Sequence, residues 1–465
     1  MNNIIIIVLL SILSTIMIIL TVIFIYYNTP NTRQSLPDKI REELGIRLSE
    51  WQELRTGKLQ VSDLSLCLEG KEPSCFGQNP ASPYTLPNWS YPSVSSFEGI
   101  PLTDQLAISS FQLDPNELFV LYGFLPPVCS YWGFTAYLIN SPNKCSGDEL
   151  AASLANTINN VNSRLDFNQP WALIVGCNND IINKFVNDLD TKYKPLVMKI
   201  PFIGRNANLT VLGRTALFED EQAALKYYSD TNTFCTVIKY QHTYDVSQTI
   251  SSVELTPRNT YFNELTEAPT TAVFNAQAEL YLSKLLKALP SSYQYIYNIE
   301  PHLFYEEYNY DSGYDCIQAC RTCLFDNRDV IYTISPIFNN INANESIVAV
   351  FGVNHSIYGK SLYTNISIYD TTTDYGLVSF DYVDTDPANY ELVVTPNELN
   401  NVNVPEGTDV YILPSNVHTF SVAERAYVQT INANGPDYSG ISAAANTLIK
   451  PRIWIISTIK DLNVN

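Results

Sequence analysis

The sequence predicts an α+β protein in which an N-terminal transmembrane helix precedes a large ectodomain. Three observations lead to this fold class: an uncharged apolar run from Ile4 to Tyr27, a β-α-β-β-α-β order of elements over residues 171–241, and a β-rich second half. The predicted domains are a transmembrane signal anchor over 1–27, a linker and stalk helix over 28–66, an α+β subdomain over 67–290, and a β-rich subdomain over 291–465.

The apolar run is long enough to cross a lipid bilayer. At a rise of about 1.5 Å per residue it would span about 36 Å, against a hydrocarbon core of about 30 Å. No Lys or Arg precedes it, and it is longer than the apolar centre of a cleaved signal peptide. We therefore expect an uncleaved anchor, with the bilayer as a partner.

The side of the membrane on which the large domain lies decides the state of its cysteines. Arg33, Lys39 and Arg41 follow the run, and the positive-inside rule would place them in the cytoplasm. The nine cysteines and the glycosylation sequons favour the opposite side. We expect a single-pass membrane protein whose C-terminal domain is extracytoplasmic.

The next predicted element is a helix from Pro37 to about Thr56, since apolar residues recur there at steps of three and four. Segments 118–122 and 131–138 are expected to form a strand pair. Ser146 and Glu149 form a capping-box pattern, which predicts a helix with Leu150, Leu154, Ile158 and Val161 on one face.

The segment 171–241 has the most regular order of elements. It contains predicted strands at 171–175, 195–200, 209–218 and 234–240, with helices at 181–189 and 220–228. This order is that of the ferredoxin-like fold. A helix at 271–289 and an acidic, tyrosine-rich loop at 293–314 follow. The β-rich half has predicted strands at 330–335, 347–353, 362–369, 377–383, 410–412, 425–430 and 451–459.

Composition excludes some functions. The net charge is −20, which opposes binding to nucleic acid because the phosphates carry the same sign. Charged residues are only 16% of the chain, and 31 residues are Tyr, so polarity comes mainly from hydroxyls and amides. A protein or glycan partner suits such a surface. No common nucleotide, hydrolase or zinc-protease motif occurs, and we expect no cofactor.

Cysteines and sequons predict covalent modifications of the ectodomain. The expected local disulfides are Cys67–Cys75 and Cys129–Cys145, whereas Cys177 is expected to be a buried thiol or a disulfide rather than a nucleophile. The disulfide candidates are Cys67, Cys75, Cys129, Cys145, Cys316, Cys320 and Cys323. The N-glycosylation sequons are at Asn88, Asn208, Asn344 and Asn365, and at Asn354, where a glycan is least expected.

The spacing Cys316-x3-Cys320-x2-Cys323 also suits a four-iron cluster, or zinc together with His302. A cytoplasm-facing metalloprotein is therefore a third hypothesis. Thr322 stands where cluster-binding enzymes usually carry an aromatic residue, and no alternating βα pattern follows. Disulfides are the favoured interpretation.

The densest polar stretch lies at residues 352–363, between two predicted strands. His355 can act there as a base, Lys360 as an electrostatic partner and Tyr363 as a proton donor. Arg328, before a strand, and Arg425, beside Glu424, complete the candidate set. These residues define the alternative function, an extracytoplasmic hydrolase acting on a glycan or ester. A glycine turn with a satisfied histidine is the structural alternative.

Four stretches resemble a family of secreted or membrane-anchored proteins found in bacteria, fungi, plants and giant DNA viruses. They are residues 117–138, 326–332 (DNRDVIY), 424–427 (ERAY) and the GVNH-x3-GK-x2-Y motif at 352–363. The resemblance covers roughly Ser109 to Ile455 and implies an exported protein without an assigned activity. The abundance of Ile, Asn and Tyr suggests a mimivirus-like origin. The leading prediction is a binding or structural role, as a virion or host-membrane component.

Overall fold

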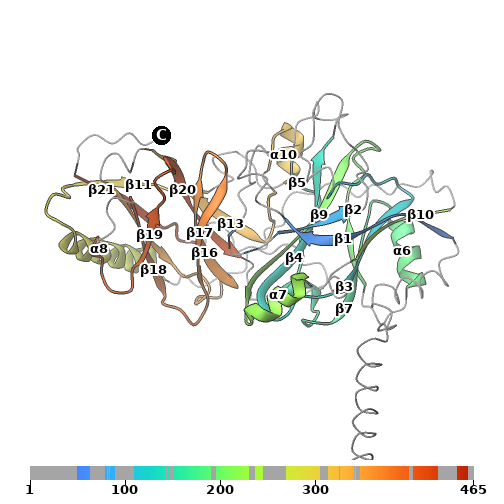
Figure 1. The fold of residues 1–465 in the computed structure, drawn as a ribbon, viewed down its shortest axis with the longest axis horizontal. Coiled ribbons are helices and arrows are strands. Elements are labelled where there is room, and N and C mark those ends of the chain that lie inside the picture. The colour runs from blue at the N-terminus through green and yellow to red at the C-terminus, as the bar shows by residue number, and fades with distance from the viewer. Residues whose placement is uncertain are drawn as a thin grey trace, which may run out of the picture.

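A computed structural model describes residues 50–62, 79–80, 82, 84–89, 109–141, 145, 150–189, 195–229, 236–243, 269–303, 313–323, 325–339, 341, 346–396, 402–427 and 448–458. These residues form two β-rich lobes that lie side by side (Figure 1). The first lobe contains the strands β1–β10, and the second contains β11–β21.

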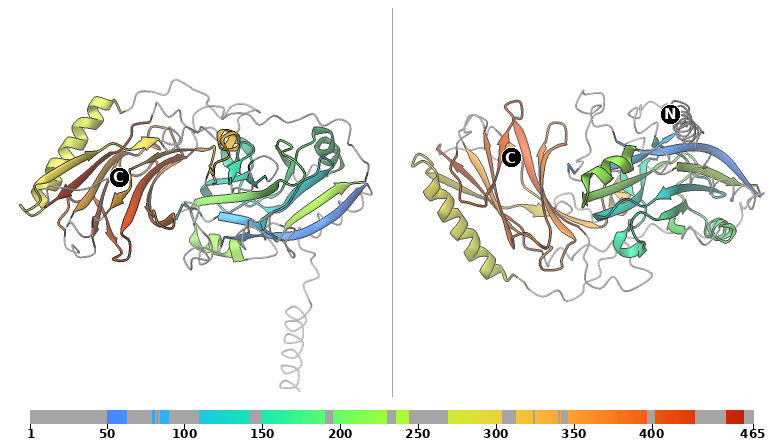
Figure 2. Two further views of the ribbon diagram at one scale, coloured as in Figure 1. Left: turned by 90° about the horizontal axis from the view of Figure 1, so that it is seen from above. Right: turned by 60° about the horizontal axis from the view of Figure 1, so that its bottom comes forward.

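The first lobe is built on one ten-stranded sheet with the order β5-β4-β9-β2-β1-β10-β3-β7-β8, in which β6 also pairs with β4. The sheet curls on itself as a half-barrel (Figure 2). Among the described strands of this sheet, only β7 and β8 pair in parallel. The strands are β1 (Trp51–Val61), β2 (Tyr84–Trp89), β3 (Glu117–Phe124), β4 (Cys129–Asn140), β5 (Ala152–Ser153), β6 (Ile158–Asn159), β7 (Pro170–Gly176), β8 (Pro195–Lys199), β9 (Asn208–Phe218) and β10 (Thr236–His242).

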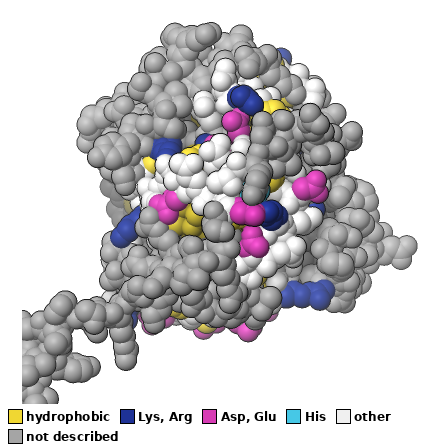
Figure 3. Space-filling model, turned by 90° about the vertical axis from the view of Figure 1, so that its right-hand side faces the viewer, with side chains coloured by type: hydrophobic (Ala, Val, Ile, Leu, Met, Phe, Trp, Pro, Cys, Tyr) yellow, Lys and Arg dark blue, Asp and Glu magenta, His cyan; other side chains and the backbone are white. Residues whose placement is uncertain are grey.

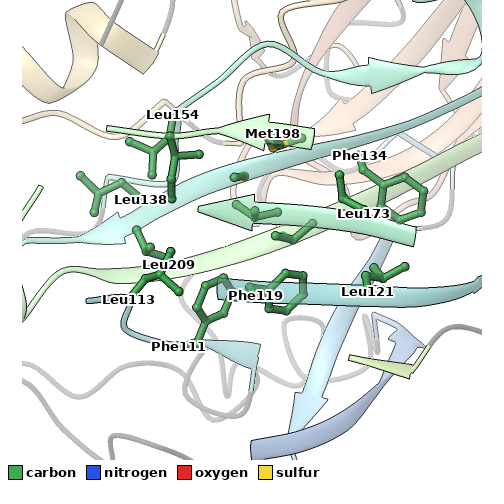
Figure 4. Close-up of a cluster of buried hydrophobic side chains, with 14 of the residues drawn as sticks. Phe111, Leu113, Phe119, Leu121, Phe134, Leu138, Leu154, Leu173, Met198 and Leu209 are labelled. Atoms are coloured by element: carbon green, nitrogen blue, oxygen red, sulfur yellow. The ribbon is translucent and has the colours of Figure 1, made fainter. Parts of the chain in front are cut away.

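Alternation along the strands gives the sheet two buried faces. Phe119 and Leu121 of β3 point into the curl, where they join the largest cluster of buried side chains (Figure 4). Leu118 and Val120 point to the other face, which α6 (Asn179–Asp188) covers. The other described helices of this lobe are α5 (Asn160–Ser163), α7 (Glu221–Ser229) and α10 (Gly313–Ala319).

The second lobe is a sandwich of two sheets, with the orders β11-β21-β15-β18-β19 and β12-β13-β20-β16-β17; β14 also pairs with β20. Helix α8 (Thr271–Ala288) packs on the outer face of the first of these sheets. The strands are β11 (Tyr295–Ile299), β12 (His302–Leu303), β13 (Val330–Ile334), β14 (Phe338–Asn339), β15 (Ile347–Val353), β16 (Tyr363–Asp370), β17 (Tyr375–Tyr382), β18 (Asn389–Pro396), β19 (Asp409–Leu413), β20 (Thr419–Tyr427) and β21 (Arg452–Ser457).

The two lobes meet through the outer faces of two sheets. Tyr131 and Ala216 of the first lobe pack with Val330, Tyr363 and Tyr427 of the second. The rings of Tyr131 and Tyr427 lie 5.1 Å apart, and those of Tyr427 and Tyr363 lie 4.4 Å apart. We call this contact region the lobe junction.

The predicted α+β fold class is wrong, because strands dominate both lobes. The predicted order of elements over residues 171–241 does occur, from β7 to β10, but these strands do not form a ferredoxin-like sheet. Strand β3 lies between β7 and β10, and β9 pairs instead with β4 and β2. Pairing with strands distant in the sequence therefore overrides the local order.

Three local predictions in the first lobe are also wrong. The predicted stalk helix runs into β1, whose Trp51 pairs with His242 and packs edge-on against Phe185. The helix predicted after Glu149 is replaced by β5, β6 and the short α5. Segments 118–122 and 131–138 are strands, but they lie apart in the sheet rather than forming a pair. Residues 28–49 of the predicted linker and stalk helix lie outside the described residues.

The described residues include no helix that is both long and apolar enough to cross a membrane. This finding contradicts the predicted localisation as a single-pass membrane protein with an extracytoplasmic domain. The segment on which that prediction rested, Ile4 to Tyr27, lies outside the described residues.

Candidate functional site

The polar stretch after β15 forms a closed turn. The Asn354 side chain donates from Nδ2 to the carbonyl oxygens of Val383, at 2.7 Å, and Pro387, at 3.2 Å. Its Oδ1 accepts from the backbone N–H of Ser356. The backbone N–H of His355 donates to Oγ1 of Thr364 at 2.9 Å. The amide of Asn354 thus holds the turn.

The imidazole of His355 is fully buried inside the sandwich, with Nε2 3.7 Å from Oε1 of Glu424. That distance is too long for a hydrogen bond. By hydrogen-bond geometry neither ring nitrogen has a partner among the described residues, although the backbone of Ile449 lies close enough to favour the protonated ring. Burial, aided by the charge of Lys360, lowers the pKa of His355 to about 3. The ring is therefore neutral near pH 7.

Glu424 is buried beside this ring and accepts a hydrogen bond from the hydroxyl of Tyr390 at 2.8 Å. Burial raises the pKa of Glu424 to about 8, although the Tyr390 hydroxyl opposes the rise. Near pH 7 most of this carboxyl group holds its proton. His355 and Glu424 thus form an uncharged pair in the core, where no substrate reaches them.

Lys360 and Tyr363 do not complete a catalytic group around His355. The backbone N–H of Lys360 donates to the carbonyl of His355 at 3.1 Å, and burial lowers the pKa of its ammonium group. Tyr363 is fully buried and stacks on Tyr427 at the lobe junction. Along β16, Ile366 points into the sandwich core, so Tyr363 faces the opposite side of the sheet from Glu424.

The segment 326–329, which carries Arg328, fastens the second lobe to the first. Arg328 donates from Nε to Oγ of Ser153 and from Nη1 to Oδ1 of Asn156, both at 3.1 Å. Asp326 accepts from the backbone N–H groups of Ser153, at 2.7 Å, and Gly313, at 3.0 Å. These contacts give Arg328 a structural role.

Asp329 and Asn327 extend the same network. Oδ2 of Asp329 accepts from the hydroxyl of Tyr131 at 2.8 Å and from Nδ2 of Asn159 at 2.9 Å. Nδ2 of Asn327 donates to the Tyr131 hydroxyl at 3.1 Å. Every side chain of the segment therefore contacts residues of the first lobe.

Arg425 lies on the junction face of β20, opposite its neighbour Glu424. Its Nη1 donates to Oδ1 of Asn365 at 3.2 Å and to Oγ of Ser367 at 3.1 Å, and its Nη2 donates to the Tyr369 hydroxyl. Its Cζ lies 5.3 Å from the ring centroid of Tyr332. The described partners of this guanidinium thus include neutral oxygen atoms and an aromatic ring.

Beside Asn365 lies a carboxylate. Nδ2 of Asn365 donates to Oδ1 of Asp381 at 2.7 Å, and burial raises the pKa of Asp381 although Asn365 opposes the rise. Arg425 also favours the charged form of this carboxylate. Asp381 is therefore a titratable acid at the lobe junction.

A second buried guanidinium, that of Arg214 in β9, approaches the same region from the first lobe. It is 2% exposed and donates from Nη1 to the Tyr137 hydroxyl and from Nη2 to the carbonyl of Phe325, both at 2.7 Å. Its Cζ lies 4.8 Å above the ring of Tyr84. Within the described ranges it makes no ion pair.

Arg214 and Arg425 share two neighbours. The tyrosines that interact electrostatically with each guanidinium include Tyr84 of the first lobe and Tyr332 of the second. Both tyrosines are partly exposed. We call Arg214, Arg425, Tyr84 and Tyr332 the junction cluster. Sequence analysis selected Arg425 but missed Arg214. The feature that could have revealed Arg214 is its position as the lone arginine in a mostly buried strand.

The disulfides differ from the predicted local pairs. Cys145 bonds to Cys320, with their Cα atoms 5.2 Å apart, and Cys316 bonds to Cys323, with a Cα–Cα distance of 5.9 Å. The predicted Cys129–Cys145 pair is wrong, because Cys129 is a free, buried thiol. The candidates Cys67 and Cys75, and also Cys235, lie outside the described residues.

The thiol chemistry follows from these pairings. Cys316, Cys320 and Cys323 all form disulfides, so in this state none offers the thiolate that an iron cluster or zinc requires. Burial raises the pKa of the free thiols Cys129 and Cys177 to about 12. Both are therefore protonated and unreactive near pH 7.

Three predicted sequon asparagines are buried and hydrogen-bonded: Asn208 to Asn140, Asn354 to the carbonyl of Val383, and Asn365 to Asp381. A glycan on any of these amides would break those bonds and would not fit in the core. We expect glycopeptide mass spectrometry after expression in a secretory host to find Asn208, Asn354 and Asn365 unmodified. A glycan at any of the three would contradict this packing.

Asn88 is the comparison site in that experiment, because its side chain is only half-buried and donates to Oε1 of Gln60 at 2.5 Å. The fifth sequon, Asn344, lies outside the described residues.

Comparisons with known proteins identify no family. No family model and no curated protein matches this chain. Among solved structures, an uncharacterised protein from Burkholderia cenocepacia aligns over 93% of this chain and 91% of its own, with 10% identity and a TM-score of 0.41. A protein from Vibrio parahaemolyticus aligns over 85% and 94%, with 10% identity and a TM-score of 0.38. Both scores are too low to carry an inference.

Proposed function

We propose that this chain is a disulfide-bonded binding protein whose ligand site is the junction cluster. One observation carries the proposal: at the lobe junction Cζ of Arg214 lies 4.8 Å from the ring centroid of Tyr84 and Cζ of Arg425 lies 5.3 Å from that of Tyr332, and both rings are partly exposed. A few fixed polar groups beside aromatic surface are typical of ligand sites.

The placement of the predicted catalytic residues supports binding over hydrolysis. His355 and Glu424 lie inside the sandwich, whereas Tyr363 and Arg425 lie on the other face of the same sheet, and Arg328 binds Ser153 and Asn156. A hydrolase needs its base within reach of the group that it deprotonates. These side chains are buried and separated, so they do not form such a pair.

The test is a binding survey with matched tyrosine variants. We expect isothermal titration calorimetry with neutral and acidic oligosaccharides and short peptides to find a ligand for the intact chain. Tyr84→Ala and Tyr332→Ala should each weaken its binding at least about tenfold, since a buried aromatic contact contributes about 1.5 kcal/mol or more. Tyr295→Ala, which changes a partly exposed tyrosine of β11, should leave the affinity unchanged.

Two results would overturn the proposal. One is that no compound in the survey binds, or that a ligand binds equally well to the Tyr84 and Tyr332 variants. The other is turnover of a chromogenic ester or glycoside that is lost in His355→Ala while the variant keeps its near-ultraviolet circular dichroism. That second result would favour the hydrolase.

A further inference from the structure

Four cysteines gather where α10 meets the rest of the first lobe. Cys316 lies in α10, Cys320 and Cys323 follow that helix directly, and Cys145 comes from a distant part of the chain. The Sγ atoms of Cys145 and Cys320 lie 3.6 Å and 3.9 Å from the carbonyl oxygen of Ile317. Both disulfides are therefore located at the C-terminal end of α10.

This part of the chain is attached to the edge of the ten-stranded sheet. We call α10 and the described residues from Cys320 to Phe325 the strap. The backbone N–H of Cys323 donates to the carbonyl of Leu150 at 2.7 Å, and that of Phe325 donates to the carbonyl of Ala151 at 2.9 Å. Leu150 and Ala151 lead directly into β5, the strand at one end of the sheet. These bonds fix the strap beside β5.

The contact between the strap and the lobe contains strained backbone. Ala151, Cys320 and Phe325 have φ angles of 40°, 52° and 59°, in the left-handed region that favours glycine. Residues other than glycine persist in this conformation where the surrounding structure holds them there. We therefore expect the contact to open more often once a constraint on it is removed.

The two disulfides constrain the strap in different ways. Cys145–Cys320 joins the strap to the first lobe and links positions 175 residues apart. Cys316–Cys323 joins two positions of the strap itself, seven residues apart. Breaking the second bond leaves the strap cross-linked to the lobe, whereas breaking the first removes that cross-link.

Exposure also distinguishes the two disulfides. Cys320 is partly exposed, whereas Cys145, Cys316 and Cys323 are only 2%, 1% and 4% exposed. A disulfide is reduced when a thiolate reaches one of its sulfur atoms, so the rate depends on access. Cys320 therefore carries the sulfur atom that a reductant reaches first.

We propose that Cys145–Cys320 is a redox switch, which a dithiol reductant opens to release the strap. One thiolate of the dithiol attacks Sγ of Cys320, forms a mixed disulfide and expels the thiolate of Cys145. The second thiol of the reductant attacks the mixed disulfide and expels the thiolate of Cys320. The protein gains two electrons and two protons, and the dithiol becomes a cyclic disulfide. The switch goes beyond the proposed binding function, and its test needs no ligand.

The first test measures the order of reduction in the unmodified chain. Free thiols are blocked, dithiothreitol is added without denaturant, and samples are quenched with acid at successive times. The samples are then unfolded and alkylated, and mass spectrometry identifies the new thiols. We expect Cys145 and Cys320 to be reduced at least about tenfold faster than Cys316 and Cys323, because access limits the attack. Equal rates, or faster reduction of Cys316–Cys323, would refute the switch.

The second test measures whether the strap opens. Hydrogen exchange with mass spectrometry compares the oxidised chain with Cys145→Ser/Cys320→Ser and, as the matched control, with Cys316→Ser/Cys323→Ser. We expect strap peptides to exchange at least about tenfold faster in the first variant and within about threefold of the unmodified rate in the second. Helix α6 covers the opposite face of the sheet, toward the end of the molecule shown in Figure 3. At exchange times too short for global unfolding, its amides should exchange equally in all three proteins.

Unchanged exchange of the strap in Cys145→Ser/Cys320→Ser, or equal acceleration in both variants, would refute the switch. Acceleration of the strap and α6 together at short times would also refute it, because the whole lobe would then be loosened. Should a variant fail to fold, the same peptides are compared in the unmodified chain before brief reduction, after it, and after reoxidation with oxidised glutathione. Faster exchange that reoxidation reverses supports the switch, and exchange that reduction leaves unchanged, or that reoxidation does not restore, overturns it.

Discussion

Replacing Cys145 and Cys320 together by serine is expected to lower the free energy of unfolding by about 5 kcal/mol. This disulfide joins residues 175 positions apart, so its loss frees a very long loop in the unfolded chain. It also ties the segment that follows α10 to the first lobe. Urea denaturation of the variant and the unmodified protein, followed by tryptophan fluorescence without reductant, measures the difference.

The second disulfide is the matched control. Cys316 and Cys323 are only seven positions apart, and their joint replacement is expected to cost about 2–3 kcal/mol on the same loop-entropy argument. If the two double variants lose equal stability, the long-range constraint is not the source of the effect.

Stability is expected to be highest at mildly acidic pH and to fall on both sides. In the folded protein the pKa of Glu424 is raised from 4.5 to about 8, so the native state holds a proton that the unfolded chain releases. Stability therefore falls as pH rises from about 4.5 to 8. The pKa of His355 is lowered from 6.5 to about 3, so stability also falls as pH drops from about 6.5 to 3.

Each group contributes a slope of up to about 1.4 kcal/mol per pH unit within its window, and the two slopes oppose each other between about pH 4.5 and 6.5. Urea midpoints measured from pH 3 to 9 test this profile. Glu424→Gln should flatten the alkaline side, and His355→Gln should flatten the acid side. Tyr390→Phe removes the hydroxyl that lowers the pKa of Glu424, so its alkaline side should extend to higher pH. An unchanged alkaline slope in Glu424→Gln would exclude this carboxyl as the source.

The elements that the sequence predicts well are those whose burial is continuous. The seven residues of β15 are apolar or glycine and all are buried, so their bounds follow from composition alone. Helix α8 likewise begins after the cap Thr270 and ends before Pro290. The stripe that predicted a stalk helix fails at Trp51, because that side chain packs against Phe185 and His242, both distant in the sequence.

The candidate site was harder to predict, for a geometric reason. Glu424 and Arg425 are neighbours in the sequence, but adjacent residues of a strand point to opposite faces, so one enters the core and the other the lobe junction. Arg214 and Tyr84 lie in strands that pair in the sheet although they are far apart in the sequence. Periodicity identifies such residues as strand positions but does not indicate their partners.

Because of the segment 326–329, we expect that the two lobes cannot be expressed as separate folded fragments. A fragment ending before Asp326 would leave the backbone N–H of Ser153, the hydroxyl of Tyr131 and the amide of Asn159 without the groups that bind them. A fragment beginning after Asp329 would start at the first residue of β13 and lack this anchor. Each half depends on the other for some of the hydrogen-bond partners of its polar groups. The two lobes are therefore expected to fold and to be degraded together.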